Sequence, residues 1–133
     1  MFYKCQIETG THNEMIDITR RVWEFIQKEN IRDGTVTIYC PHTTAGITIN
    51  ENADPNVVHD LLMRWDEVYP LKHPGYLHVE GNSAAHLKAS TIGASQTIPV
   101  VHGDMVLGTW QGIYLCEFDG PRARTFFVKL YKE

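Results

Sequence analysis

The sequence predicts an α+β fold: a mainly antiparallel β-sandwich or barrel-like sheet with two or three helices. About seven short stretches alternate apolar and polar residues or are rich in β-branched residues, a pattern typical of strands. Only two or three stretches show helical spacing or a helix-start signal, and the second half of the chain consists mostly of strands. The chain has 133 residues, which fits one domain spanning residues 1–133.

The first part of the chain predicts a strand, a helix and a second strand. Residues 2–8 alternate and should form a strand. From about Asp17, which can cap a helix, to Asn30, apolar residues recur at helical spacing. Residues 35–40 alternate again and contain several β-branched residues, which predicts the next strand. The side chains that should share its inner face are Val36, Ile38 and Cys40.

A polar loop, a further strand and two helices come next. Alternation resumes at Ile47 and Ile49, in a strand that delivers Asn50 and Glu51 at its end. Asp54-Pro55 starts a helix, with a carboxylate N-cap and proline at the first helical position. The apolar face of that helix should consist of Val58, Leu61, Leu62 and Trp65. A loop over residues 66–77 should lead to a short helix from Gly81-Asn82-Ser83 to about Ser90.

The remaining chain predicts four strands. They cover residues 94–101, 105–109, 112–118 and 123–131. His102-Gly103-Asp104 should be a turn, and Asp119-Gly120 is a hairpin signal. The last strand carries apolar residues on both faces, so a helix or a neighbouring subunit should cover its second face.

Composition argues against several classes of function. The formal net charge is −4 and no long run of Lys and Arg occurs, so nucleic acid is not an expected partner. No apolar run approaches the ~20 residues of a membrane span, and the N-terminus lacks the pattern of a signal peptide. The three cysteines have no CxxC spacing, which predicts reduced thiols in a cytoplasmic protein.

Three polar stretches are expected to build one pocket: HTTAGITINENAD from His42, HVEGNSAAH from His78, and GTWQGIYLCE from Gly108. His42 follows a strand end, whereas His78 and His86 lie on either side of a helix start. Neutral imidazoles are common zinc ligands, and three of them with an open position describe a catalytic metal site. Taken singly, each histidine could instead be a turn, capping or surface residue.

Acidic, amide and basic residues accompany the histidines. Glu51, Asp54 and Glu117 are candidate acid/base groups, partners of ligand histidines or magnesium ligands. Asp54 could also be only a helix cap, and Glu117 lies in an apolar strand, where it needs a partner if buried. Asn82 and Ser83 at a helix N-terminus, together with Arg122, could bind phosphate, although ordinary capping and solvation are alternatives. The other candidate substrate contacts are Thr43, Thr44, Asn50 and Gln111.

Together, HTTAGITINENADP, HVEGNSAAHLKAS and LGTWQGIYLCEFDGPR resemble the motifs of the YjbQ-like family, in the family's order and over roughly residues 15–130. The resemblance implies a compact α+β fold, a homotrimer with a polar pocket near subunit contacts, and in some members a bound metal such as zinc. It also implies the activity of a secondary thiamine-phosphate synthase, which joins a pyrimidine carried on diphosphate to a thiazole phosphate. The matching positions are His42, Thr43, Thr44, Asn50, Glu51, Asp54, His78, Glu80, Asn82, His86, Trp110, Gln111 and Glu117, with Asp119 and Arg122 close behind. Asn56 departs from the family pattern, in which an acidic residue is more usual.

The main hypothesis is therefore a trimeric enzyme in which His42, His78 and His86 hold a divalent metal, zinc or alternatively magnesium, and a small phosphorylated molecule is the substrate. A metal-assisted hydrolase of a small phosphorylated or amide substrate could use the same groups. A third hypothesis is a non-catalytic ligand-binding or assembly protein with a structural metal.

Overall fold

The computed structural model describes all 133 residues and contains three helices and eight strands. The strands are Phe2–Glu8 (β1), Glu14–Asp17 (β2), Gly34–Tyr39 (β3), Ala45–Glu51 (β4), Ser95–Val101 (β5), Asp104–Met105 (β6), Gln111–Glu117 (β7) and Ala123–Lys132 (β8). The helices are Thr19–Lys28 (α1), Pro55–Val68 (α2) and Ser83–Ile92 (α3). A five-stranded sheet has the order β1-β8-β3-β5-β6, and a three-stranded sheet has the order β2-β7-β4. Because every strand pair is antiparallel, the predicted α+β class is confirmed.

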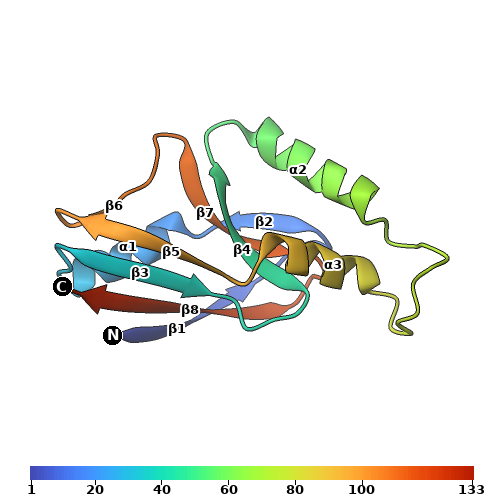
Figure 1. The fold of residues 1–133 in the computed structure, drawn as a ribbon, viewed down its shortest axis with the longest axis horizontal. Coiled ribbons are helices and arrows are strands. Elements are labelled where there is room, and N and C mark those ends of the chain that lie inside the picture. The colour runs from blue at the N-terminus through green and yellow to red at the C-terminus, as the bar shows by residue number, and fades with distance from the viewer.

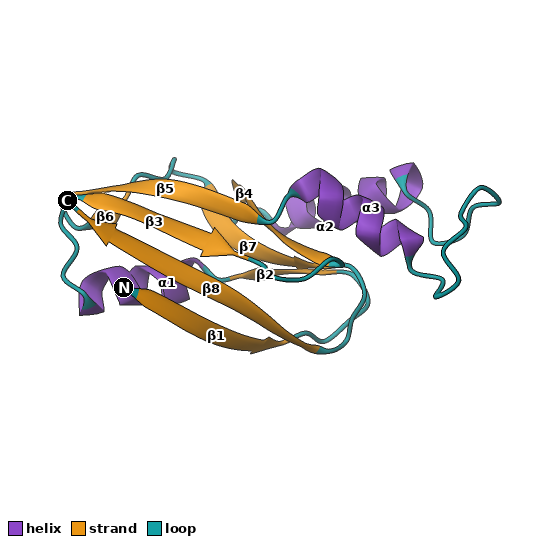
Figure 2. Ribbon diagram, turned by 60° about the horizontal axis from the view of Figure 1, so that its bottom comes forward, coloured by secondary structure: helices purple, strands orange, loops and turns teal.

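The main hydrophobic core combines residues from both sheets with the inner face of α1. Figures 1 and 2 show the two sheets with α1 at one end of the molecule and α2 and α3 at the other. On β3, the predicted inner residues Val36 and Ile38 are fully buried, and Cys40 beyond the strand end is buried as well. On β8, alternate residues face the same core, as the period of two requires.

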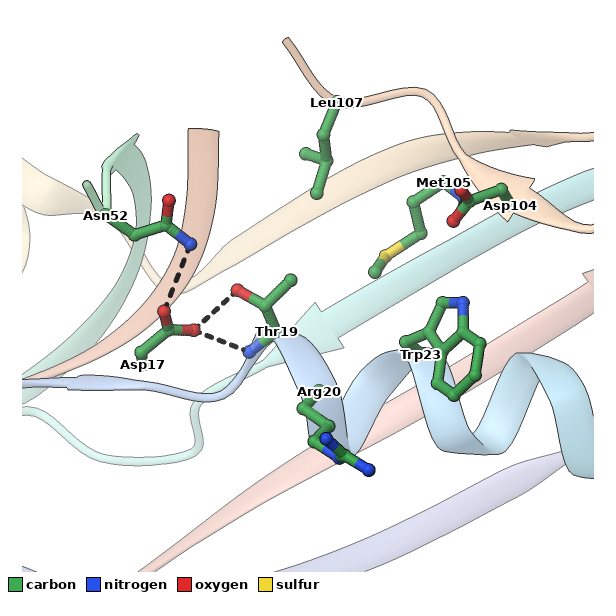
Figure 3. A pocket seen from close by; sticks show the side chains of 8 residues that line it. All are labelled: Asp17, Thr19, Arg20, Trp23, Asn52, Asp104, Met105 and Leu107. Atoms are coloured by element: carbon green, nitrogen blue, oxygen red, sulfur yellow. Dashed lines mark hydrogen bonds between the residues drawn. The ribbon is translucent and has the colours of Figure 1, made fainter. Parts of the chain in front are cut away.

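The helix α1 begins two residues later than predicted. Asp17 ends β2, and its carboxylate accepts hydrogen bonds from the backbone N–H of Thr19 (2.9 Å) and from the Thr19 hydroxyl (2.5 Å; Figure 3). The residue at the N-cap position is Ile18, whose side chain makes no capping bond. The strand β2 was not predicted, because it has only four residues and none of them is fully buried.

The helices α2 and α3 lie against the three-stranded sheet. Ala85 and Ala89 of α3 form a second, smaller core with Tyr114, Cys116 and Phe118. The predicted start of α2 is confirmed, since the Asp54 carboxylate accepts the N–H of Asn56 (2.9 Å) and proline follows the cap. The predicted apolar face of α2 is only half-buried, however, and no residue of this helix is fully buried. None of the helices has the length and apolarity that crossing a membrane would require.

The outer face of the five-stranded sheet is exposed in the single chain. Phe127 of β8 stacks between Phe2 and Tyr39, with ring centroids 5.0 and 6.5 Å away, and Tyr131 is 63% exposed. No helix is among the stacking partners, so coverage of this face by a neighbouring subunit stays a prediction. The strand β6 is also shorter than predicted, because Leu107 N–H bonds to the carbonyl of Met105 in a turn.

Candidate functional site

The pairing of β4 with β7 divides the three polar motifs between two ends of the molecule. Ala45 pairs with Glu117, and Glu51 pairs with Gln111, so the two strands run in opposite directions. The six residue steps between these pairs separate the two ends by about 20 Å, at ~3.3 Å per residue. The first motif therefore starts where the third one ends. Within one chain the predicted single pocket is wrong, and the candidate residues form two groups.

One group surrounds a polar cavity of about 290 Å³. All its lining residues are polar: Thr43, Thr44, His78, Glu80, Asn82, His86, Asp119 and Arg122. His86 belongs to the first turn of α3, and His78 lies on the loop before it. Their rings stand edge to face with centroids 5.3 Å apart, and His78 Nε2 lies 3.9 Å from the Glu80 carboxylate. The prediction that these two histidines meet is confirmed.

Two larger hollows adjoin the polar cavity at the histidines. One, of about 490 Å³, has Tyr76, Leu77 and Leu87 in its walls and shares His78 and His86 with the polar cavity. The other, of about 480 Å³, lies along α3, and its lining residues are His42, Thr43, Ala45, His86, Ala89, Ser90, Gly93 and Ala94. The side chain of His86 consequently contributes to three hollows of different polarity.

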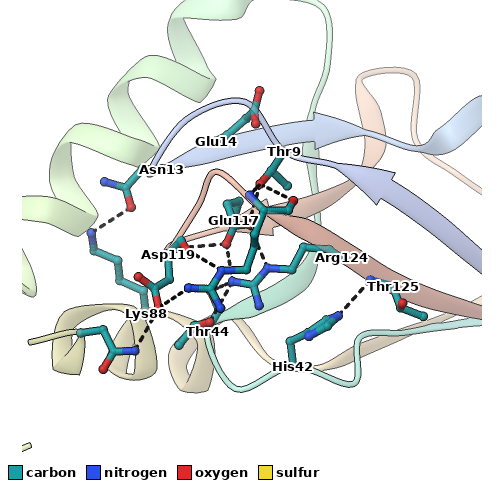
Figure 4. Close-up of polar contacts among 12 residues, drawn as sticks. Thr9, Asn13, Glu14, His42, Thr44, Lys88, Glu117, Asp119, Arg124 and Thr125 are labelled. Carbon is teal, nitrogen blue, oxygen red and sulfur yellow. Dashed lines mark hydrogen bonds and ion pairs between the residues drawn. The ribbon is translucent and has the colours of Figure 1, made fainter. Parts of the chain in front are cut away.

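His42 does not join the histidine pair as a third ligand. Its Nε2 accepts the backbone N–H of Thr125 on β8 at 2.9 Å, as Figure 4 shows. Burial, followed by the charge of Arg124, lowers the pKa of His42 below its ordinary value, so the ring is neutral at pH 7. No group of three His, Cys, Asp or Glu side chains in the chain is arranged to hold a metal ion. The predicted set of three histidine ligands is therefore not formed within one chain, in which His42 Nε2 instead accepts the N–H of Thr125.

A buried ion pair between Glu117 and Arg124 bonds to Thr44 and Asp119, two residues that line the cavity (Figure 4). Glu117 Oε1 accepts hydrogen bonds from Arg124 Nε and Thr9 Oγ1, both 2.8 Å, and Oε2 accepts Arg124 Nη2 and the N–H of Asp119 (3.0 Å). Burial alone would raise the pKa of Glu117, but the bonds from Arg124, Asp119 and Thr9 outweigh it and leave the pKa below its usual range. With no exposed surface and both oxygens engaged, Glu117 is a positioning residue, and the predicted acid/base role does not fit this geometry.

The ion pair fixes the positions of Thr44 and Asp119 through hydrogen bonds. Arg124 Nη2 donates to the carbonyl (3.2 Å) and the hydroxyl (2.8 Å) of Thr44. The N–H of Asp119 bonds to Glu117, and the Asp119 carboxylate in turn accepts Arg122 Nη2 at 3.1 Å. From the sequence, Arg124 was considered only as a possible phosphate contact or a solvated hairpin residue; it is instead buried against Glu117, and Thr9 was not singled out at all. The one signal for them was the need of a carboxylate in an apolar strand for a partner.

Asn82 departs from the usual role of asparagine at a helix start. Its Nδ2 donates to Asp119 Oδ2 (2.9 Å), and its side chain makes no capping bond to α3. Its Oδ1 is buried and has no hydrogen-bond partner. A buried acceptor without a donor is costly, and the N-terminus of α3 also remains without a side-chain cap. Both features leave hydrogen-bonding capacity beside the cavity.

The second group of predicted residues lies at the other end of the β4–β7 pair. Glu51, Asp54 and Trp110 border a separate hollow of about 520 Å³. These side chains and their neighbours serve local turns: Glu51 Oε2 accepts the N–H of Asp54 (3.2 Å), and Gln111 Oε1 accepts the N–H of Gly108 (2.7 Å). Asn50 Oδ1 likewise accepts the N–H of Glu51 (2.7 Å). The prediction that this second group of residues shares one site with the histidines is wrong for the single chain.

The sequence matches the family model described as "UPF0047 protein YjbQ-like" over residues 3–133. The chain belongs to the YjbQ/UPF0047 family. Within this family, the chain is 60% identical to the UPF0047 protein YugU of Bacillus subtilis over 130 residues, which cover 98% of both chains. It is 51% identical to a UPF0047 protein of Methanocaldococcus jannaschii, with 98% of this chain and 94% of that protein covered.

Solved structures of YjbQ/UPF0047 proteins share the fold. A protein of Clostridium acetobutylicum, described as an uncharacterized conserved member of the family, superposes with a TM-score of 0.95 at 50% identity, covering 97% of this chain and 99% of that one. A protein of Sulfolobus solfataricus, described as of unknown function, also gives a TM-score of 0.95, at 34% identity and with 100% and 97% covered. The overall fold is thus common to this bacterial and this archaeal relative.

Proposed function

We propose that this YjbQ/UPF0047 chain is a small metal-dependent enzyme that acts on phosphorylated small molecules at the His78–His86 pair. The observation that carries the proposal is the place of this pair between a wholly polar cavity and a hollow with aromatic and aliphatic walls. A phosphorylated heterocycle has the same two parts, an anionic group and an apolar ring. The thiamine-phosphate synthesis implied by the sequence resemblance joins two molecules of that kind.

His78 and His86 would hold the divalent ion. Imidazole nitrogens suit zinc, and the carboxylates of Glu80 and Asp119 line the same cavity. Since no three such side chains are arranged around a metal in the single chain, the ion would have two histidine ligands and open positions for water or phosphate oxygens. When bound, the ion would offset negative charge on a diphosphate group.

Arg122 and the N-terminus of α3 would bind the phosphate. The Arg122 guanidinium is fixed by bonds to the carbonyl (2.8 Å) and carboxylate (3.1 Å) of Asp119, and its side chain is 49% exposed. Guanidinium groups and uncapped helix N-termini both favour phosphate oxygens. The unpartnered Oδ1 of Asn82 would accept a hydrogen bond from an amino group of the substrate.

These groups would serve the two sides of thiamine-phosphate synthesis differently. In that reaction the bond between the pyrimidine methylene carbon and the diphosphate oxygen breaks, and the same carbon forms a bond to the thiazole nitrogen. Arg122 and the α3 N-terminus would hold the departing diphosphate, whereas Tyr76 and Leu77 would shield a ring from water. The chain's own contribution is orientation and charge stabilisation.

The test measures metal content and product formation with the same protein samples. His86→Ala should lose the bound divalent ion and the activity with a pyrimidine diphosphate and a thiazole phosphate. The matched control is His59→Ala, because His59 has an exposed side chain bonded only to its neighbour Asp60. Stoichiometric metal and full activity in His86→Ala would refute the proposal. Phosphate release without product would instead identify a metal-assisted hydrolase.

We also propose self-association, as the family resemblance implies a homotrimer. Large apolar side chains are exposed on α2 and on the loop before α3, among them Val68 (56%), Leu77 (92%) and Val79 (96%). Burial of such side chains between subunits would be favourable, because it removes apolar area from water. Light scattering coupled to gel filtration should give three times the 15.2 kDa chain mass, and a monomer at micromolar concentration would contradict this.

A further inference from the structure

The largest hollow of the chain, of about 660 Å³, is not part of the proposed active site (Figure 3). It lies beside the first turns of α1 and includes Asn52, the residue that follows β4. This is the end of the β4–β7 pair that is remote from His86. The residues that form its walls are Asp17, Trp23, Asn52, Asp104, Met105 and Leu107. Neither the fold nor the proposed function accounts for its chemistry.

Trp23 is the first unexplained feature of this hollow. The helix α1 buries Val22 and Ile26 in the core, next to its N-cap residue Ile18, whereas Trp23 is not part of this core and is 40% exposed. A tryptophan contributes large apolar area when it is covered, and its ring face attracts cations. Its indole lines the same hollow as the Asp104 side chain (Figure 3).

One end of the hollow carries a carboxylate in a fixed orientation. Asp17 Oδ2 accepts Asn52 Nδ2 at 3.2 Å, while Oδ1 binds the first residue of α1, Thr19. The Thr19 hydroxyl in turn accepts the N–H of Ile113 (2.8 Å). Asn52 can approach only because residue 112 is glycine: a Cβ there would lie 2.4 Å from Asn52 Nδ2. The free lone pair of Asp17 Oδ2 and the unbonded Asn52 Oδ1 remain as acceptors at this end.

The opposite end carries a second carboxylate. Asp104 Oδ1 accepts the N–H of Met105 (2.8 Å), and its other oxygen has no hydrogen-bond partner in the chain. Met105 and Leu107 lie between the two ends (Figure 3). The only cation at the rim, Arg20, has a side chain that is 86% exposed and pairs with Glu24 at 3.2 Å. The hollow thus has acceptors at both ends and apolar side chains between them.

We propose that this hollow binds an α,ω-diamine. One ammonium group would bind Asp104 against the face of the Trp23 indole, which combines a charged hydrogen bond with a cation–π contact. The methylene chain would lie along Met105 and Leu107. The second ammonium would bind Asp17 Oδ2 and Asn52 Oδ1. The site is independent of the proposed enzymatic function, because none of its residues lines the cavity around His86.

The test is a calorimetric titration of the full chain with linear diamines of increasing length, at about 0.15 M ionic strength to screen non-specific attraction. We expect saturable binding of one diamine per chain, with an optimum length, and much weaker binding of the monoamine of equal length. Asp104→Asn and Trp23→Phe should each weaken binding, Asp104→Asn by roughly 10- to 100-fold, the factor of a charged hydrogen bond. Quenching of fluorescence that is absent in Trp23→Phe would place the ligand at this indole.

Two controls separate this site from other effects. His86→Ala should bind the diamine like the wild type, and Arg20→Ala should bind it equally or more tightly because a competing cation is removed. Thermal melting verifies that Asp104→Asn and Trp23→Phe are folded. Absence of saturable binding, equal binding of the monoamine, or unchanged affinity in the folded Asp104→Asn variant would overturn the proposal.

Discussion

Replacing Glu117 by glutamine should destabilise the protein strongly, although it only replaces one carboxylate oxygen by an NH₂ group. The carboxylate has no exposed surface and accepts four hydrogen bonds, two of them from Arg124, which is itself only 3% exposed. Glutamine would leave the Arg124 charge buried without a counterion and would direct an NH₂ group at two donors. Removing one partner of such a pair costs about 3–5 kcal/mol.

The expected effect is large enough to measure by thermal melting. With an unfolding entropy of about 2.1 cal/mol/K per residue, this loss lowers the melting temperature of the 133-residue chain by about 10–18 °C. The matched control is Glu24→Gln, which alters an exposed ion pair and should change stability by less than about 1 kcal/mol. All variants are compared at one protein concentration, since self-association would shift the transition.

A double variant distinguishes a buried ion pair from simple loss of packing. The double variant Glu117→Leu/Arg124→Met contains no uncompensated buried charge. Its loss of unfolding free energy should therefore be much smaller than the sum of the losses measured for Glu117→Leu and Arg124→Met separately. The reasoning is refuted if Glu117→Gln melts within about 2 °C of the wild type. It is also refuted if the free-energy loss of the double variant equals the sum of the losses of Glu117→Leu and Arg124→Met.

Three further predictions concern stability. Gly46→Ala should cost about 1–3 kcal/mol, measured by urea unfolding, because the new Cβ would lie 2.6 Å from the carbonyl oxygen of Gly93; an unchanged midpoint would disprove this contact. Asp54→Ala should cost about 1 kcal/mol through loss of the α2 cap, seen as a lower melting temperature, whereas Asp54→Ser should largely retain it. His42 has a lowered pKa in the folded state because of burial and a neighbouring guanidinium, so its contribution is complete above about pH 6.5 and is lost as the pH falls towards the folded-state pKa. As the pH falls below about 6.5, wild-type stability should therefore decrease more steeply than that of His42→Gln, and parallel curves would contradict this role.

Local signals predicted most of the secondary structure. The cap at Asp54 with Pro55, the alternation in Val36 and Ile38, and the start of α3 near Ser83 depend on neighbours in the sequence, and each was found where it was expected. The four residues of β2 could not be recognised, because their pairing partner β7 lies about a hundred residues later.

The candidate site was predicted less well, because it depends on strand direction. Residue types and spacing indicated that His78 and His86 should meet, and they do. An antiparallel sheet was predicted, but nothing local indicated that β4 would pair with β7 in the register that places Glu51 beside Gln111 and away from the histidines. The use of the His42 ring by Thr125 was equally hidden, since these residues lie 83 positions apart.

The loop between α2 and α3 is only weakly attached to the two sheets. Its backbone bonds, such as Tyr76 N–H to the carbonyl of His73, run mostly within the loop or to the end of α2, and Leu77 and Val79 are almost completely exposed. In a chain that is not self-associated, a protease could therefore cut this stretch while both sheets keep their hydrogen bonds. Cleavage near His78 would separate it from His86, so a nicked preparation could melt like intact protein and still have lost its imidazole pair.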